Sequence, residues 1–209
     1  MPNFRVLFSK DDVLVFISHL DLNHAFIRAL NRADVPLRYS EGFNPHPKLV
    51  FALPLSVGMA GENELLDIGV ADEPVTAERL LALLREQMPP HVTVKAVYEP
   101  DKKFKDICAA QYRVVFFRTG FADELKKLLS GEIKVVKKTK SGEKEIDIAP
   151  QVRESRVEES DGQTILSLTL DAGPDGYLNP ELLVKAMRER ALVSDDEPYA
   201  VSRTAILFH

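Results

Sequence analysis

The chain contains a single cysteine, Cys108, among its 209 residues. One thiol excludes an internal disulfide framework, a zinc site of four thiolates, and an iron–sulfur cluster held by three thiolates of this chain. Cys108 follows Ile107 and precedes two alanines. A cysteine in such surroundings is more often a small buried apolar residue than a reactive thiol.

Long apolar runs are also absent. No stretch approaches the roughly 20 apolar residues that a membrane helix requires, and the first twelve residues carry charges too early for a signal peptide. The composition, 45% hydrophobic and 28% charged, is that of a chain able to bury a core. We therefore expect a soluble, cytoplasmic protein with no membrane partner.

Several catalytic signatures are missing as well. The sequence has neither a Walker A motif nor a G-x-G-x-x-G motif, so nothing indicates a phosphate-binding glycine loop. It has no G-x-S-x-G motif, and no cysteine lies in an activating motif, so acyl or thiol nucleophile chemistry finds no support.

Positive charge is scarce overall but concentrated in one region. The net charge of −5 argues against indiscriminate binding of nucleic acid through the whole surface. Residues 101–150, however, carry 12 Lys and Arg against 8 Asp and Glu. The excess lies around Lys126, Lys127, Lys134, Lys137, Lys138, Lys140 and Lys144. This pattern permits an anionic partner, and it equally fits a solvated helix face and hairpin tip.

The two halves of the chain show the same order of elements. In the first half, the hydrophobic pattern predicts strands at 4–8, 13–17, 48–55, 64–70 and 91–98 and helices at 19–33 and 76–88. In the second half, it predicts strands at 111–117, 132–138, 163–170 and 200–208 and helices at 121–130 and 179–190. We therefore predict an α+β protein of two tandem ferredoxin-like β-α-β-β-α-β domains, residues 1–99 and 110–209, joined by a linker at 100–109.

The first helix has a clear apolar face. At 100° per residue, Leu22, Phe26, Ala29, Leu30 and Ala33 share one side of the helix, and we expect that side to be buried. Ser18 and Asp21 are the candidate caps at its start.

The segment from 36 to 58 departs from ordinary packing chemistry. Pro45 and Pro47 bracket His46 and restrict the backbone there, so side chains are presented at low entropic cost. Gly42 can supply a positive φ or a close backbone approach. The segment crowds together candidate binding residues Arg38, Tyr39, Ser40, Phe43, Asn44, His46 and Lys48. The alternative is a structured crossover with Tyr39 and Phe43 in the core.

These residues also carry a resemblance to a known family. The stretches RVLFSK, VFISHLDL and IRALNRADVPLRYSEGFNPHPKLVFALPL, followed by KSGEKEIDIAP at 140–150, resemble the bacterial DUF2344 family, also called radical-SAM-linked proteins. Members of that family occur as free-standing chains or as the C-terminal portion of radical SAM proteins. The resemblance implies association with a radical SAM partner in RNA or translation-related chemistry.

This chain cannot itself be the radical SAM enzyme, because the Cys-x-x-x-Cys-x-x-Cys run of such enzymes needs three cysteines. Any cluster belongs to the partner, and we expect no cofactor and no metal here. Our leading hypothesis is a non-catalytic accessory protein that presents tRNA, rRNA or another substrate to that partner. Phosphates would meet the basic side chains of Arg28, Arg32, Arg38 and Lys48. Tyr39 or Phe43 would stack on a base, and Ser40, Asn44 and His46 complete the candidate set.

His19 supports two alternatives. Together with Asp21 and His46 it has the side-chain types of a metal site, although a SHLD sequence at a helix start more often provides local capping. The layout is also similar to that of the CRISPR RNA-processing endonucleases, some of which place a histidine in or near the first helix for metal-free RNA cleavage. A third possibility is a protein-docking module that contacts no RNA.

Overall fold

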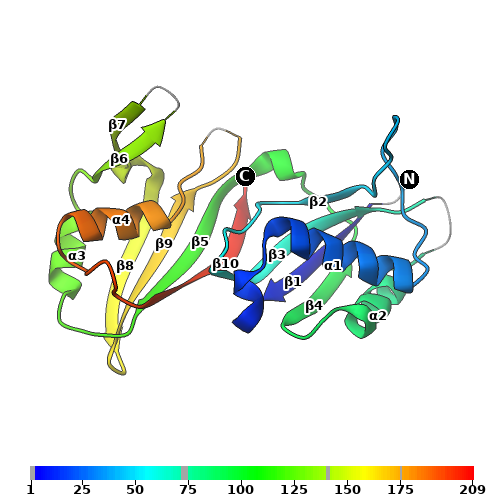
Figure 1. Ribbon diagram of the computed structural model, residues 1–209, viewed down its shortest axis with the longest axis horizontal. Coiled ribbons are helices and arrows are strands. Elements are labelled where there is room, and N and C mark those ends of the chain that lie inside the picture. The colour runs from blue at the N-terminus through cyan, green and yellow to red at the C-terminus, as the bar shows by residue number, and fades with distance from the viewer. Residues whose placement is uncertain (1–2, 72–74, 140–141, 175) are drawn as a thin grey trace. The chain divides into compact units, whose positions relative to one another are not determined.

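The computed structural model describes residues 3–71, 75–139, 142–174 and 176–209. The chain is a mixed α+β protein that divides into two compact units, with the boundary between Phe104 and Lys105 (Figure 1). This boundary falls inside the predicted linker 100–109. The last residues of that range are not a linker, because a short 3₁₀ turn at Phe104–Asp106 leads directly into a strand that begins at Ile107.

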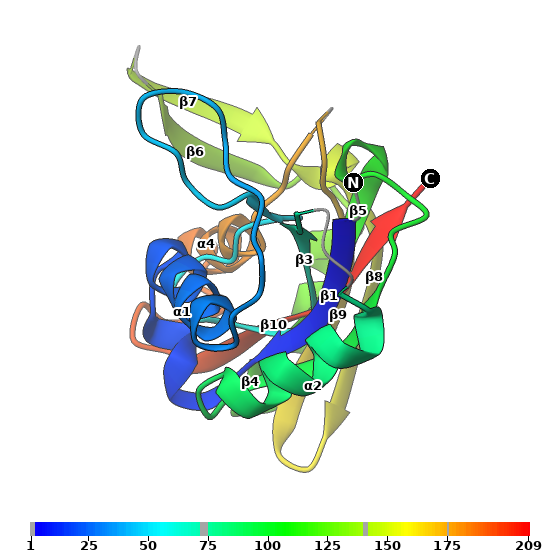
Figure 2. The same cartoon turned by 90° about the vertical axis from the view of Figure 1, so that its right-hand side faces the viewer.

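The first unit is a four-stranded antiparallel sheet with two helices. Its elements are β1 (Asn3–Lys10), α1 (His19–Arg32), β2 (Leu49–Phe51), β3 (Met59–Gly69), α2 (Ala77–Gln87) and β4 (Val92–Tyr98). The strand order is β4-β1-β3-β2, and every pair is antiparallel. In Figure 2 both helices lie on one face of this sheet.

The apolar face of α1 builds the core of the first unit. The predicted face is confirmed: Leu22, Phe26, Ala29 and Leu30 are buried against alternate residues of β1 and β3, and Ala33 is half-buried. Burying each large side chain of this kind stabilises the fold by about 1.5–3 kcal/mol. Both predicted caps act at the helix start. Ser18 Oγ accepts from the Asp21 amide at 3.1 Å, and the Asp21 carboxylate accepts from the Ser18 amide at 3.3 Å.

Two strand predictions in the first unit need correction. Residues 13–17 are not a strand, because Asp12–Phe16 forms a 3₁₀ helix, whose first residue, Asp12, has a left-handed backbone (φ 49°). A short apolar run has no periodicity that separates a strand from a helical turn. The predicted strand 48–55 shrinks to Leu49–Phe51, since Pro47 and Pro54 flank it and neither has an N–H for a ladder bond.

The second unit repeats the sheet and adds a hairpin. Its elements are β5 (Ile107–Phe116), α3 (Ala122–Leu129), β6 (Lys134–Thr139), β7 (Gly142–Asp147), β8 (Val152–Ser160), β9 (Gln163–Asp171), α4 (Glu181–Glu189) and β10 (Tyr199–Phe208). The main sheet has the order β10-β5-β9-β8, again with all pairs antiparallel. Strands β6 and β7 pair only with each other among the described residues.

The sequence pattern misassigned one strand of this unit. It treated 132–138 as a strand of the main sheet, whereas those residues contribute to the β6–β7 hairpin, and β8 occupies the sheet position instead. Strand β8, with the sequence VRESRVEES, has no buried residue. It lies at the sheet edge, where charged side chains discourage pairing with other chains. Its low hydrophobicity hides it from a search based on apolar alternation.

Among the described residues, no helix combines the length and the apolar character needed to cross a membrane.

A partly buried ion pair joins the two central strands of the first unit. Arg5 of β1 stands directly opposite Asp67 of β3, and its Nε and a terminal nitrogen donate to the two carboxylate oxygens at 2.7 and 2.8 Å. Arg5 is only 2% exposed, and its guanidinium lies 4.2 Å from the ring centre of Phe104. The pair therefore supports the observed register of β1 on β3.

We predict that Asp67→Ala lowers the free energy of unfolding by roughly 3 kcal/mol, because it deprives the buried guanidinium of this carboxylate. Equilibrium urea unfolding followed by circular dichroism measures the loss. Arg153→Ala is the matched control, since it removes an arginine whose pair with Asp171 is more exposed, and it should change stability far less. An equal loss in both variants would contradict the assignment.

Candidate functional site

The segment that connects α1 to β2 is fastened at its base to the end of β3. The Arg38 amide donates to the Gly69 carbonyl at 2.9 Å, and the Gly69 amide donates to the Lys48 carbonyl at 2.9 Å. The Lys48 amide in turn donates to the Arg38 carbonyl at 2.8 Å. These three bonds hold both arms of the segment on one strand end. We refer to residues 38–48 as the 38–48 loop.

The two arms of the 38–48 loop also bind each other. The Ser40 amide donates to the His46 carbonyl at 2.9 Å, and the His46 amide donates to Ser40 Oγ at 3.1 Å. Ser40 Oγ lies 2.9 Å from His46 Nδ1 as well. Gly42 adopts φ 121°, as its predicted role in the turn requires. The loop is thus an ordered projection that rises away from the helices in Figure 2.

A pocket of about 430 Å³ lies along the base of the loop. It brings together four predicted binding residues, Arg38, Ser40, His46 and Lys48, with residues of β2 and β3. Its remaining lining residues are Pro47, Leu49, Val50, Asp67 and Gly69. We call this pocket the loop groove.

Gly69 and Asp67, which the sequence analysis did not select, determine the shape and the charge of the loop groove. A Cβ on Gly69 would lie 3.0 Å from two nitrogens of the Arg38 guanidinium, so glycine allows that side chain to lie flat against β3. Asp67 is already paired with Arg5, which offsets its negative charge. Arg38 and Lys48 therefore give the groove a net positive charge. The sequence offered one signal for the role of Gly69. A glycine inside a strand often marks a site where another group approaches the backbone closely.

The aromatic residues of the loop lie outside the loop groove. Phe43 is fully exposed at the loop tip, and Tyr39 is 47% exposed. The alternative that both residues are core anchors is therefore wrong. Asn44 is exposed beside Phe43, and its carbonyl oxygen lies 3.5 Å from His46 Nδ1.

The structure does not bring Arg28 and Arg32 into the loop groove. Arg32 donates to the side chain and the backbone carbonyl of Gln87, the last residue of α2. It thereby satisfies a carbonyl at a helix C-terminus, which is a structural task. Arg28 is exposed on α1, where its charge helps to lower the pKa of Asp21, after the larger effect of hydrogen bonds from Ser18.

His19 packs against an aromatic ring. Its ring centre lies 4.8 Å from that of Phe51 in an edge-to-face arrangement, and burial lowers its pKa. The hypothetical metal site of His19, Asp21 and His46 does not form, since no group of three potential ligands is assembled among the described residues. The capping interpretation of the SHLD sequence is confirmed by the Ser18 and Asp21 bonds described above.

Part of the basic segment lies outside the described residues. Lys140 and Ser141 belong to that part, so the family-like stretch 140–150 is described only from Gly142. In the described part of the hairpin, Lys137 stands opposite Lys144 across β6 and β7, and both are exposed. Like charges in direct cross-strand positions repel each other.

Cys108 is a half-buried residue of β5, and its Sγ lies 3.6 Å from the Leu207 carbonyl oxygen. Cys108 is thus less buried than the sequence analysis expected.

We predict that Ser40→Ala loosens the 38–48 loop, because Ser40 Oγ accepts from the His46 amide. Removal of a bond worth about 1.4 kcal/mol corresponds to roughly tenfold faster exchange of the His46 amide with deuterium. Hydrogen exchange measured by NMR tests this expectation. Ser130→Ala, which removes a hydroxyl from the end of α3, should leave His46 exchange unchanged.

We also predict that the pKa of His19 lies below 6.5 and rises in Phe51→Ala, because water then reaches the ring. In the native chain the neutral form is favoured, so the unfolded chain binds more protons in the window just below pH 6.5. The contribution of His19 to stability is therefore present above pH 6.5 and is lost as the pH falls. NMR titration of the His19 ring protons gives both midpoints, and an unchanged midpoint in the variant would argue against burial as the cause.

Comparison with known proteins gives a family and a likeness of fold. No curated protein matches the chain. A chain in the crystal structure of a Cbf5–Nop10–Gar1 complex has a TM-score of 0.50 and 10% identity. The match covers 97% of this chain and 48% of that one, so the present chain spans about half the length of its structural neighbour.

An unknown protein from Galdieria sulphuraria has a TM-score of 0.30 and 11% identity, over 98% of this chain and 99% of that one. The TM-score of this second match is too low to support an argument. The likeness to the chain of the Cbf5–Nop10–Gar1 complex concerns the fold alone, because the identity is only 10%. The sequence model of DUF2344, described as an uncharacterised protein conserved in bacteria, matches residues 3–180. The chain therefore belongs to the DUF2344 family.

Proposed function

We propose that this protein is an accessory RNA-binding protein whose loop groove holds a phosphate group of the RNA. One observation carries the proposal: Arg38 and Lys48 line the same groove, while the carboxylate beside them is already matched by Arg5. Two cations that line one concave site make its potential positive, which favours an anionic ligand.

The chemistry of the loop groove suits a phosphate oxygen. The Arg38 guanidinium presents several donors in one plane, which is the geometry that bidentate phosphate recognition uses. Lys48 adds a flexible point charge from the other arm of the loop. Ser40 and His46 hold the two arms together, so the backbone that carries both cationic residues is ordered before the ligand arrives, which lowers the entropic cost of binding.

The loop tip suits an unpaired base. Phe43 is exposed on an ordered loop, so stacking on its ring costs little conformational freedom. Recognition of single-stranded RNA commonly uses aromatic stacking together with polar contacts to base edges. Asn44, next to Phe43, carries an amide that can donate and accept hydrogen bonds. We therefore propose that the tip contacts a base adjacent to the bound phosphate.

We propose further that the protein works in the cytoplasm with a radical SAM partner. The support is the resemblance of the chain to the DUF2344 family, also called radical-SAM-linked proteins, together with its single cysteine, which leaves cluster chemistry to another chain. We also propose that both units are ferredoxin-like domains. The orders β4-β1-β3-β2 and β10-β5-β9-β8, each with two helices, support this classification.

The direct test compares RNA affinity of the full chain with that of Arg38→Ala/Lys48→Ala. We expect the double variant to bind a single-stranded RNA more than about tenfold more weakly, since each charged hydrogen bond that is removed is worth about 1.5 kcal/mol or more. The slope of log affinity against log salt should become shallower by about 0.7 for each phosphate that the variant no longer neutralises.

The control is Arg28→Ala/Arg79→Ala, which removes two exposed charges from α1 and α2 of the same unit. It should preserve most of the affinity. Phe43→Ala should weaken binding without changing the salt slope, because stacking releases no counterions. If Arg38→Ala/Lys48→Ala binds like the native chain, the loop groove is not the RNA site.

Two other outcomes would replace the proposal. RNA cleavage to cyclic-phosphate ends that disappears in His19→Ala would identify a metal-independent endonuclease. Co-purification with a radical SAM protein, with no RNA protected by either chain, would identify a docking module.

A further inference from the structure

The main sheet of the second unit has one face that its own helices do not cover. In β5, Tyr112, Val114 and Phe116 are buried, and they alternate with the more accessible Arg113 and Val115. In strand β9, Leu166, Leu168 and Leu170 are buried and alternate with the half-buried Ile165 and Ser167, and the alternation ends at Thr169, which is also buried. Because successive side chains of a strand point to opposite faces, the buried set faces α3 and α4. Figure 1 shows both helices on one side of these strands. We call the other side the open face.

The register places polar residues of the open face in transverse rows. Arg113 of β5 stands opposite Ser202 of β10 on one side and Ser167 of β9 on the other, and Ser167 stands opposite Arg156 of β8. The row therefore reads Ser202–Arg113–Ser167–Arg156 across four strands. The two arginines are two strands apart, or about 10 Å between backbones. We call this row of four residues the arginine row.

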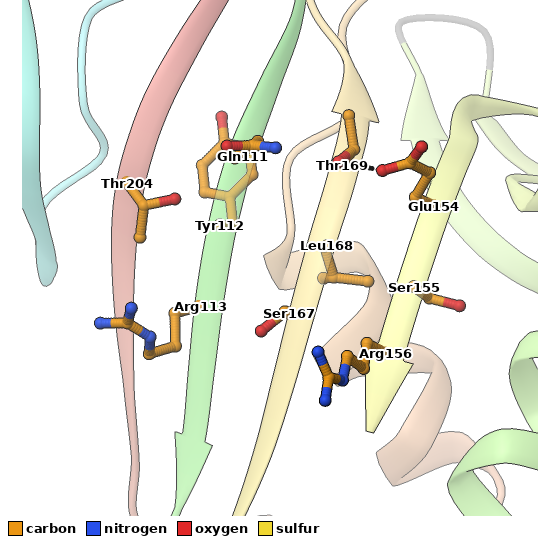
Figure 3. Close-up of a pocket in the computed structure, with 10 residues that line it drawn as sticks. All are labelled: Gln111, Tyr112, Arg113, Glu154, Ser155, Arg156, Ser167, Leu168, Thr169 and Thr204. Atoms are coloured by element: carbon orange, nitrogen blue, oxygen red, sulfur yellow. Dashed lines mark hydrogen bonds between the residues drawn. The ribbon is translucent and has the colours of Figure 1, made fainter. Parts of the chain in front are cut away.

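A second polar row lies two residues further along the strands. Gln111 of β5 stands opposite Thr169 of β9, which stands opposite Glu154 of β8. The Thr169 hydroxyl donates to a Glu154 carboxylate oxygen at 3.3 Å, as the dashed line in Figure 3 marks. This bond orients the carboxylate beside the arginine row.

All residues of the two rows except Ser202 line a shallow pocket of about 520 Å³. In Figure 3 the Arg113 side chain extends from β5 over β10, away from Ser167, and the Arg156 side chain extends from β8 toward β9. The lining residues are Gln111, Tyr112, Arg113, Glu154, Ser155, Arg156, Ser167, Leu168, Thr169 and Thr204. Beside Tyr112 and Leu168, this lining offers guanidinium, carboxylate, amide and hydroxyl groups that can form hydrogen bonds with a polar ligand.

We propose that the open face of the second unit is a separate binding site for single-stranded RNA. Arg113 and Arg156 contact phosphate oxygens, with the Ser167 hydroxyl between them as a further donor. The Glu154 carboxylate accepts a hydrogen bond from a ribose 2′-hydroxyl, the group that distinguishes RNA from DNA. Gln111 offers a donor and an acceptor to a base edge.

The nearby acidic groups are compatible with this assignment. Glu158, in the next row of β8, forms an ion pair with Arg156. Both side chains of that pair are well exposed, at 75% and 47%, so the pair is weak and can be exchanged for a phosphate contact. Glu154 carries a negative charge that would repel a phosphate, which is why it is assigned to a neutral hydroxyl.

The inference rests on the proposed function in taking RNA as the ligand, but it uses residues of the other unit. The experiment therefore measures four proteins in parallel by fluorescence anisotropy: the full native chain, Arg113→Ala/Arg156→Ala, Arg38→Ala/Lys48→Ala, and the control Lys126→Ala/Lys127→Ala. The control removes two exposed positive charges from α3, on the helical side of the same unit. The probes are a short single-stranded RNA and a DNA of the same sequence, each labelled with fluorescein.

We expect Arg113→Ala/Arg156→Ala to bind RNA about tenfold or more weakly than the native chain, and its salt slope to become shallower by about 0.7 for each phosphate that it no longer neutralises. Arg113→Lys/Arg156→Lys should restore the slope but only part of the affinity, because lysine keeps the charge and lacks the planar fork. If the alanine pair binds like the control, the open face is only a solvated sheet surface.

Glu154→Gln separates recognition of ribose from simple repulsion. If Glu154 only repels phosphates, its neutralisation should increase the affinity for RNA and for DNA by the same factor. We expect the affinity for DNA to increase and the ratio of RNA affinity to DNA affinity to fall. An unchanged ratio would overturn the proposed contact of Glu154 with the ribose 2′-hydroxyl.

The loop-groove variant keeps the two proposals apart. A loss of affinity only in Arg38→Ala/Lys48→Ala overturns the open-face site and leaves the proposed function in place. A loss only in Arg113→Ala/Arg156→Ala does the reverse, and no binding by the native chain at low salt overturns both.

Discussion

The candidate site depends on three backbone hydrogen bonds at the end of β3, where Arg38, Gly69 and Lys48 bond to one another in a closed set. A long connection between a helix and a strand would ordinarily be mobile. Here both of its arms end on one strand terminus, and glycine at that terminus lets a guanidinium lie against the backbone. The sheet therefore sets the backbone positions of Arg38 and Lys48. The Arg5–Asp67 pair beneath them removes a competing charge.

The sequence predicted those elements whose signals are local. The helix over 19–33 was recognisable because its apolar face and its Ser18–Asp21 cap lie within a few turns of each other. Strand β8 was not, since an edge strand rich in charge has no apolar alternation to detect. The 3₁₀ turn at Asp12–Phe16 was mistaken for a strand because a short apolar run fits either conformation.

The distinction between local signals and contacts made only in the folded chain also applies to the candidate site. Arg38, Ser40, His46 and Lys48 are close in sequence, and prolines restrict the loop between them, so their gathering followed from local pattern. Asp67 and Gly69 reach the groove only through the pairing of β2 with β3, which the sequence does not specify residue by residue. The arginine row is a stronger case, because its members on β5, β9 and β8 become neighbours only once three strands have a fixed register. The contact of Arg32 with Gln87 could not be predicted, because Gln87 lies on another helix.

The position of the β6–β7 hairpin in the order of elements matches that of the 38–48 loop. It lies between the first helix of the second unit and the strand β8 that follows. The 38–48 loop lies between the first helix of the first unit and the strand β2 that follows. The two units thus elaborate the same connection, one with an ordered loop and one with a charged hairpin. That crossover is the point at which this architecture accepts extra chain while its sheet order stays intact, so new surface chemistry can arise there without a change to either core.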